Sequence, residues 1–195
     1  MQAPLLKWLS DVDTHNLFSD VGYNDFLPSG YDLEDFCAIP GVSYFCKDLM
    51  SSIVGPGVDN ATLFDQDNME LWLHHFPAGT SSQEMAHYAQ LVVNDNLALY
   101  DYGTDGNQRH YGSDSPPVYN ITNLNKVSLP IALFAGGDDI LADPDDVLRL
   151  ITTVGADRFV QINNVPFFNH MSFVWGKDAP ELVWSKAIDL IKKYA

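Results

Sequence analysis

The feature of the sequence that most constrains its fold is a change in periodicity near Val127, where short apolar runs begin to alternate with amphipathic helical patterns. Residues 129–134 form an apolar run that ends at two glycines, as a buried parallel strand does, and residues 159–163 read as a second strand. Strands that alternate with helices predict a parallel sheet covered by helices. Because two strands do not complete such a sheet, we expect this part to be the edge of a larger α/β domain.

Each predicted strand is followed by a predicted helix. The first helix begins after Asp143, a favoured N-cap residue, with Pro144 at the first helical position. The second is expected to be capped by Asp178 and Glu181, which have the spacing of a capping box. The apolar stripes expected to face inward are Val147, Leu148, Leu150, Ile151 and Val154 in the first helix and Trp184, Ala187, Ile188 and Ile191 in the second.

The first 125 residues have a different texture, in which helical segments are separated by polar loops rich in aromatic residues, glycine and proline. Residues 81–93 are the clearest helix, because Ser81 and Glu84 make a capping box and apolar side chains recur on one face. The sequence therefore divides into residues 1–125, which are mainly helical, and residues 126–195, which contain the strands.

Side chains suited to acid–base chemistry follow the two predicted strands. Asp138 and Asp139 come directly after the first strand, and His170 follows the second. Loops at the ends of neighbouring parallel strands lie side by side, and a carboxylate there can orient a histidine that takes a proton from a nucleophile. The pattern alone fits a simple glycine-aspartate turn and a surface histidine equally well. Spacing does not choose between Asp138 and Asp139, whereas Asp143 is more simply a helix cap.

Several segments resemble the acid lipases of the gastric and lysosomal kind. They occur in the family's order along nearly the whole chain: NDFLPS, HHFPAGTSSQEMAHYAQLV, RHYGSDSPPVYNIT, GGDDILADPDDV and VPFFNHMSFVWGKDAP. The resemblance implies an α/β-hydrolase core with a helical cap over its active site. Residues 1–125 would then be cap, and residues 126–195 would be the C-terminal end of the core, with its last two strands and their helices.

The resemblance implies that Asp139 is the acid and His170 the base of a Ser-Asp-His triad, acting on triacylglycerols or steryl esters without a cofactor. Phe168 replaces the family's usual tyrosine, and Ser172 its usual aspartate. No Gly-x-Ser-x-Gly motif occurs in the 195 residues. We therefore expect a partial lipase without the N-terminal half of its core. The alternative is a non-catalytic pseudoenzyme or lipid-binding cap module, which would use aromatic-rich loops at Trp72, Phe76, Phe167 and Phe168.

The two cysteines, Cys37 and Cys46, are nine positions apart. Taken alone, the pair is more simply explained as two buried free thiols. The resemblance instead aligns both with a disulfide of the family's cap, and it implies secretion or a lysosomal location. Glycosylation sequons at Asn60 and Asn120 agree with a secreted ancestry.

Composition narrows the choice of partners and compartment. Ten basic against 26 acidic residues give a net charge of -16, which argues against a nucleic-acid partner. No run approaches the roughly 18 apolar residues of a membrane-spanning helix. The first 18 residues lack the apolar stretch of an export signal, so either the protein stays inside the cell or the sequence begins partway through a longer one. No cluster has metal-ligand spacing, and four histidines are read as structural or surface residues: His74, His75, His87 and His110.

Overall fold

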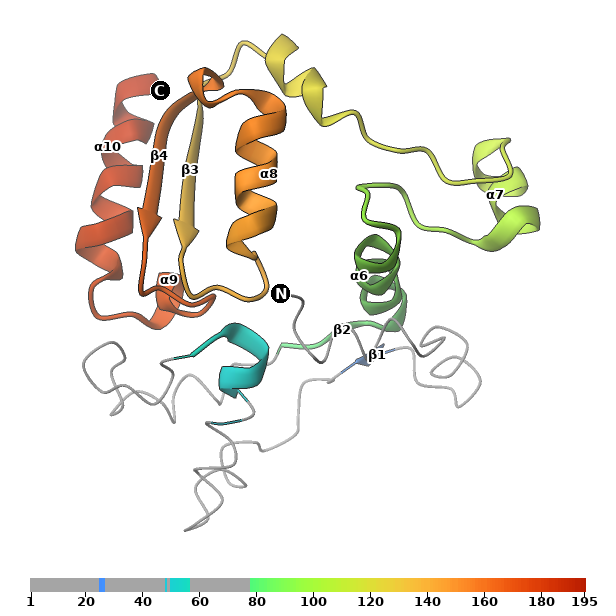
Figure 1. Ribbon diagram of the computed structural model, residues 1–195, viewed down its shortest axis with the longest axis horizontal. Helices are drawn as coiled ribbons and strands as arrows, with labels where there is room; N and C mark the ends of the chain where they lie inside the picture. The colour runs from blue at the N-terminus through green and yellow to red at the C-terminus, as the bar shows by residue number, and fades with distance from the viewer. Residues whose placement is uncertain (1–24, 27–47, 49, 57–77) are drawn as a thin grey trace. The chain divides into compact units, whose positions relative to one another are not determined.

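The computed structural model describes residues 25–26, 48, 50–56 and 78–195 (Figure 1). The chain divides into two compact units. The described residues of the first unit are 48, 50–56 and Ile121–Ala195, and those of the second are 25–26 and 78–120. The first unit contains the two predicted strands and the residues proposed for acid–base chemistry.

The first unit contains a two-stranded parallel sheet made of β3 (Ile131–Gly136) and β4 (Phe159–Val165). The register places Gly136 opposite Val165, so both strands end at the same edge. The first strand begins later than predicted because Pro130, within the expected run, has no amide hydrogen to donate to a ladder. The sheet confirms the predicted parallel α/β pattern.

The crossover between the strands consists of α8 (Pro144–Val154) and the 3-10 turn η3 (Ala156–Arg158). The helix begins as predicted, with the Asp143 carboxylate accepting a hydrogen bond from the Asp145 amide at 2.9 Å. Its predicted apolar stripe is only partly inward. Val154 is buried, whereas Leu148 is exposed. In Figure 1, α8 lies on the β3 side of the sheet and the last helix on the β4 side.

The start of the last helical segment differs from the prediction. Neither Asp178 nor Glu181 caps a helix with its side chain. Residues Pro180–Trp184 instead form the π-helical turn η4, and α10 (Ser185–Tyr194) continues from it. The backbone carbonyl of Asp178 accepts hydrogen bonds from the amides of Glu181 and Leu182, at 3.2 and 2.8 Å. The backbone therefore starts this helical segment without the expected capping box.

The π turn lies at the start of the stripe that was predicted to face inward, and this prediction is only partly correct. The turn closes with a bond from the Ser185 amide to the Pro180 carbonyl, five residues back, where an α-helix would bond four residues back. One extra residue rotates the rest of the helix by about 100° relative to a continuous α pattern. Of the residues predicted to face inward, Trp184, Ile188 and Ile191 are exposed, whereas Ala187 is half-buried. Val183 is 3% exposed and supplies the inward contact.

One core cluster of this unit lies where the strand ends meet η4 and the loop that follows β4. Its buried residues pack with partly buried aromatic and aliphatic side chains. The members are Val165, Phe168, Ala179 and Val183, surrounded by Phe134, Phe173 and Leu182. The rim of the sheet is therefore fixed by close packing where the candidate site lies.

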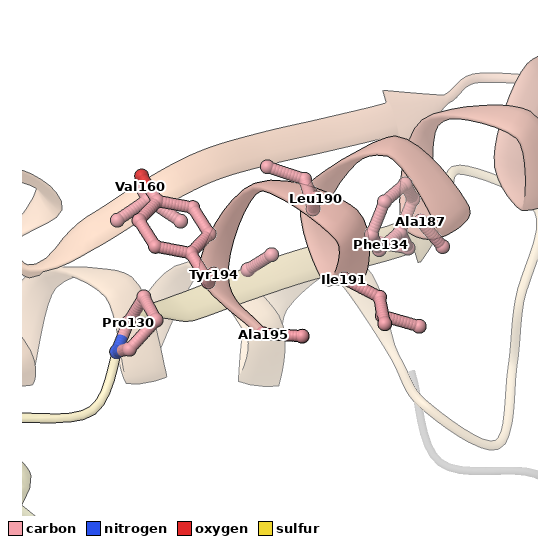
Figure 2. Close-up of a pocket in the computed structure, with 9 residues that line it drawn as sticks. Pro130, Phe134, Val160, Ala187, Leu190, Ile191, Tyr194 and Ala195 are labelled. Carbon is pink, nitrogen blue, oxygen red and sulfur yellow. The ribbon is translucent and has the colours of Figure 1, made fainter.

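A shallow apolar groove lies between α10 and one face of the sheet, and Figure 2 shows its side chains. Side chains alternate along a strand, so every second residue of β3 and its approach contributes to it. The lining consists of Pro130, Ala132, Phe134, Val160, Ala187, Leu190, Ile191, Tyr194 and Ala195. Val160, Ile191 and Tyr194 are exposed, so the described residues leave apolar surface uncovered here.

The second unit is built around α6 (Ser82–Asn94), which follows β2 (Thr80–Ser81); β2 pairs antiparallel with β1 (Asp25–Phe26). As predicted, the Ser81 hydroxyl accepts a hydrogen bond from the Glu84 amide, at 3.0 Å. The Glu84 carboxylate accepts from the Thr80 hydroxyl at 2.6 Å, in place of the return bond of the predicted capping box.

A second helix of this unit, α7 (Gly103–Tyr111), carries an aromatic cluster. His110 stacks on Tyr102, with ring centroids 4.0 Å apart. His87 of α6 lies 2.9 Å from the Ala98 carbonyl oxygen through its Nε2. Both histidines thus have packing contacts within this unit. In the part of the chain that the structure describes, no helix is long and apolar enough to cross a membrane.

Candidate active site

Asp139 and His170 meet at the rim of the parallel sheet. Asp139 follows β3, His170 follows β4, and the His170 Nδ1 lies 3.0 Å from the Asp139 Oδ2. The two residues are 31 positions apart in the sequence, so the strand pairing brings them together. The proximity expected from the sequence is therefore present in the structure.

Two glycines, the last residue of β3 and the one after it, let the loops approach each other. A Cβ atom at Gly137 would lie 2.3 Å from the Pro166 carbonyl oxygen, and one at Gly136 would lie 2.3 Å from that of Phe168. The contact between the two loops is held by backbone hydrogen bonds, including one of 3.0 Å from the Asp138 amide to the Phe168 carbonyl. Larger residues would push the loops apart, which explains the glycine pair directly before the aspartates.

The Asp139 carboxylate is 3% exposed and both of its oxygens accept hydrogen bonds. Oδ1 accepts from the amides of Leu141 and Ala142, at 2.9 and 2.8 Å, while Oδ2 faces His170. Burial raises the pKa of the Asp139 carboxyl, but the hydrogen bonds from His170 and the two amides outweigh it and lower that pKa below its ordinary value. Asp139 is therefore a rigidly held anion.

His170 is more open, since 45% of its side chain is exposed. The hydrogen bond to Asp139 raises the pKa of the His170 imidazole above its ordinary value, although burial opposes this. With Nδ1 facing the carboxylate, Nε2 is the nitrogen available to exchange a proton with another group. The pair thus has the geometry of an oriented general base.

The neighbouring carboxylates occupy different positions. Asp138 is exposed and contributes its backbone amide to the contact between the loops. Asp143 caps α8, as its position before Pro144 predicts. The geometry therefore selects Asp139 as the carboxylate that contacts His170, where spacing in the sequence leaves the choice open.

Of the other predicted site residues, the structure describes only Asn120. Cys37, Cys46 and Asn60 lie outside the described residues, so their disulfide and glycosylation stay predictions. Asn120 is exposed, just before the 3-10 helix η2 (Ile121–Lys126). Within the described ranges, no group of three or more His, Cys, Asp or Glu side chains could hold a metal ion.

The aromatic pair before His170 is divided between core and surface. Phe168 is 2% exposed and packs edge-to-face on Phe173, with ring centroids 5.4 Å apart. It is therefore a core residue and does not offer the lipid-binding surface considered from the sequence. Phe167 is 41% exposed and is the member of the pair that reaches solvent. Trp72 and Phe76 lie outside the described residues.

Asn169, the residue before His170, has no role predicted from the sequence pattern. Its side chain is 1% exposed and makes hydrogen bonds in two directions, toward its own loop and toward residues 55–56. Asparagine is usually a surface or turn residue, so nothing in the local pattern marks this one as buried. The one indication of a role in the sequence is its position beside His170 within VPFFNHMSFVWGKDAP, a segment that resembles the acid lipases.

Comparisons with known proteins identify relatives of the chain. It is 33% identical over 196 residues to Lipase lipl-1 of Caenorhabditis elegans, an alignment covering 96% of this chain and 47% of that lipase. It is 34% identical over 160 residues to human Gastric triacylglycerol lipase, covering 82% and 38%. It is 32% identical over 199 residues to rat Lysosomal acid lipase/cholesteryl ester hydrolase, covering 98% and 47%. No protein-family model matches the chain.

These relatives imply an α/β-hydrolase fold, with which the parallel sheet and its crossover helix are compatible. The chain spans about half the length of the curated relatives it matches, or less. By sequence it belongs to the acid-lipase family, whose gastric and lysosomal members it matches over most of its length.

Proposed function

We propose that this chain is the C-terminal part of a lipase that hydrolyses carboxylic esters of neutral lipids. In this proposal residues 126–195 are the end of the hydrolase core and residues 1–125 belong to its cap. The observation that carries it is the contact of 3.0 Å between Asp139 and His170 at the C-terminal rim of a parallel sheet. The substrate class follows the relatives, whose names specify triacylglycerol and cholesteryl ester.

The proposed chemistry needs a serine from outside these 195 residues. Its hydroxyl attacks the ester carbonyl while His170 Nε2 takes the proton, and Asp139 stabilises the resulting imidazolium. His170 then returns the proton to the departing alcohol, leaving an acyl-enzyme. Water activated by the same histidine hydrolyses this intermediate and frees the fatty acid. The buried Asp139 carboxylate fits the role of stabilising the imidazolium, and the more exposed His170 ring fits that of exchanging protons with the substrate.

The proposal includes a secreted or lysosomal location, in line with the gastric and lysosomal relatives. In such a compartment Cys37 and Cys46 are expected to form a disulfide, and Asn60 and Asn120 to be glycosylated. Closing so short a loop would stabilise the folded chain by about 2 to 3 kcal/mol.

The proposed function is tested by the transcript upstream of the codon for Met1. We expect it to encode an oxyanion-hole loop and a Gly-x-Ser-x-Gly motif that follows a predicted strand. A transcript that is intact upstream and encodes no such motif would contradict the lipase proposal.

A non-catalytic lipid-binding role is the second candidate, and the uncovered apolar groove and Phe167 favour it. Titration of the purified chain with a fluorescent fatty acid distinguishes the two. Saturable binding together with an upstream region that lacks the serine motif would support this second role, whereas no saturable binding would exclude it.

A further inference from the structure

We propose that Asn169 is a positioning residue for His170, which it holds by fastening the histidine loop to residues 54–56. The inference rests on the proposed function for its catalytic meaning, but the juxtaposition is independent of it. Asn169 is 1% exposed and lies between the buried Phe168 and His170. The oxygen and the nitrogen of its side-chain amide both make hydrogen bonds, as a buried amide requires.

The amide oxygen of Asn169 organises the histidine loop internally. It accepts hydrogen bonds from the backbone amides of Met171 and Ser172 and from the Ser172 hydroxyl, each at 3.0 Å. The Ser172 hydroxyl in turn accepts a hydrogen bond from the backbone amide of Asn169, at 3.0 Å. This closed network fixes the backbone on both sides of His170.

The amide nitrogen of Asn169 reaches a segment more than a hundred residues earlier in the chain. It donates to the Pro56 carbonyl at 2.8 Å and, less favourably, to the Gly55 carbonyl at 3.4 Å. The His170 backbone amide donates to the Val54 carbonyl at 3.0 Å. The histidine is therefore attached to residues 54–56 through both its own backbone and its neighbour's side chain.

The same segment also contacts the loop that carries the acid. Gly55 has a φ of +106°, and a Cβ there would lie 2.1 Å from the Asp138 carbonyl oxygen and 3.0 Å from the Asn169 Cβ. Val54 is 3% exposed and packs with Met171 and Trp175. Residues 54–56 are thus held against both loops, so the attachment made by Asn169 sets where the imidazole meets Asp139.

The test is an NMR titration of the His170 ring in the full 195-residue chain, with the signal assigned by its loss in His170→Ala. Asn169→Ser keeps a short oxygen that can accept from the Met171 and Ser172 amides but cannot reach Pro56. We expect the titration midpoint of His170 to fall toward the one measured in Asp139→Asn. Asp138→Asn is the matched control, because it alters an exposed side chain of the neighbouring loop and leaves the hydrogen bonds of Asn169 in place, so its midpoint should stay near the wild-type value.

A folded Asn169→Ser chain with the wild-type midpoint would overturn the inference. If Asn169→Ser does not fold, the titration midpoint of His170 is measured in Val54→Ala, a milder truncation that loosens the same segment. An unchanged midpoint in folded Val54→Ala would also overturn the inference. The readout needs no ester hydrolysis. An upstream region without the serine motif would therefore contradict the proposed function, whereas the titration would still show whether Asn169 positions His170.

Discussion

Asp139 uses its two carboxylate oxygens for different purposes. Oδ1 is held by two backbone amides of its own loop, which leaves Oδ2 directed at His170. An aspartate anchored in this way loses little side-chain freedom when it binds the imidazole. This anchoring is the residue-scale basis of the site.

We predict that Asp139→Asn lowers the pKa of His170 toward that of an ordinary histidine, about 6.5, because the anion that favours the imidazolium is lost. Asp138→Asn is the control, since that side chain is exposed and does not contact the ring. NMR titration of both variants measures the change. Equal midpoints in the two variants would show that Asp139 does not set the protonation of His170.

The pair also predicts how stability depends on pH. The raised pKa of His170 adds stability below about pH 6.5 that is lost as pH rises through the raised value. The lowered pKa of Asp139 adds stability above about pH 3.9 that is lost as pH falls through the lowered value. Denaturant unfolding should therefore show the largest difference between wild type and Asp139→Asn near pH 5 and a smaller one at pH 8. A difference that grows toward pH 8 would disprove this linkage.

Among the elements, the crossover from β3 to β4 has two identifiable supports, and the first is the cap of α8. Asp143→Ala removes the acceptor for the Asp145 amide and should cost about 1 kcal/mol of unfolding free energy. Asp143→Asn keeps an N-cap oxygen and should cost much less. Urea denaturation compares them, and equal losses in the two variants would mean that capping is not the cause.

The second support is Arg158, which ends η3 just before β4. Its guanidinium donates to the carbonyls of Leu124 at 3.0 Å, Leu129 at 2.6 Å, and Val127, so it joins the approach to β3 with the start of β4. Arg158→Met keeps the apolar stem and should cost about 2 to 4 kcal/mol of unfolding free energy.

Arg149 offers a matched control for that measurement. It forms an exposed ion pair with Asp146 at 3.5 Å, so Arg149→Met should change the unfolding free energy by less than about 1 kcal/mol. Urea denaturation of the two methionine variants should separate them clearly. Similar losses would show that the carbonyl contacts of Arg158 contribute no more than a surface pair.

The elements also show which features a sequence pattern can predict. The N-caps at Ser81 and Asp143 are local, because a side chain bonds an amide two or three residues away, and both were predicted. The π turn at Pro180–Trp184 was not, since it depends on how the segment packs at the rim of the sheet. The attachment of Asn169 to Pro56 was missed for a similar reason, as it joins residues 113 positions apart.

For the molecule as a whole, the site geometry and the family relationship agree, while the chain spans about half of its relatives' length or less. We predict that the 195 residues alone hydrolyse p-nitrophenyl butyrate no faster than their His170→Ala variant, because the sequence contains no Gly-x-Ser-x-Gly motif to supply the nucleophile. Turnover that disappears in His170→Ala would show that these residues hold a nucleophile of their own.

The proposed function depends above all on Asp139 and His170 acting as acid and base in ester hydrolysis. The most direct test uses the longer protein that the proposed function expects, and compares its rate of triacylglycerol hydrolysis between Asp139→Asn and Asp138→Asn. We predict that kcat falls by about 10³ to 10⁴ in Asp139→Asn, as expected when a triad histidine loses the group that orients it, and changes little in Asp138→Asn. Wild-type kcat in Asp139→Asn, or equal losses in both variants, would show that Asp139 does not act with His170 in this way.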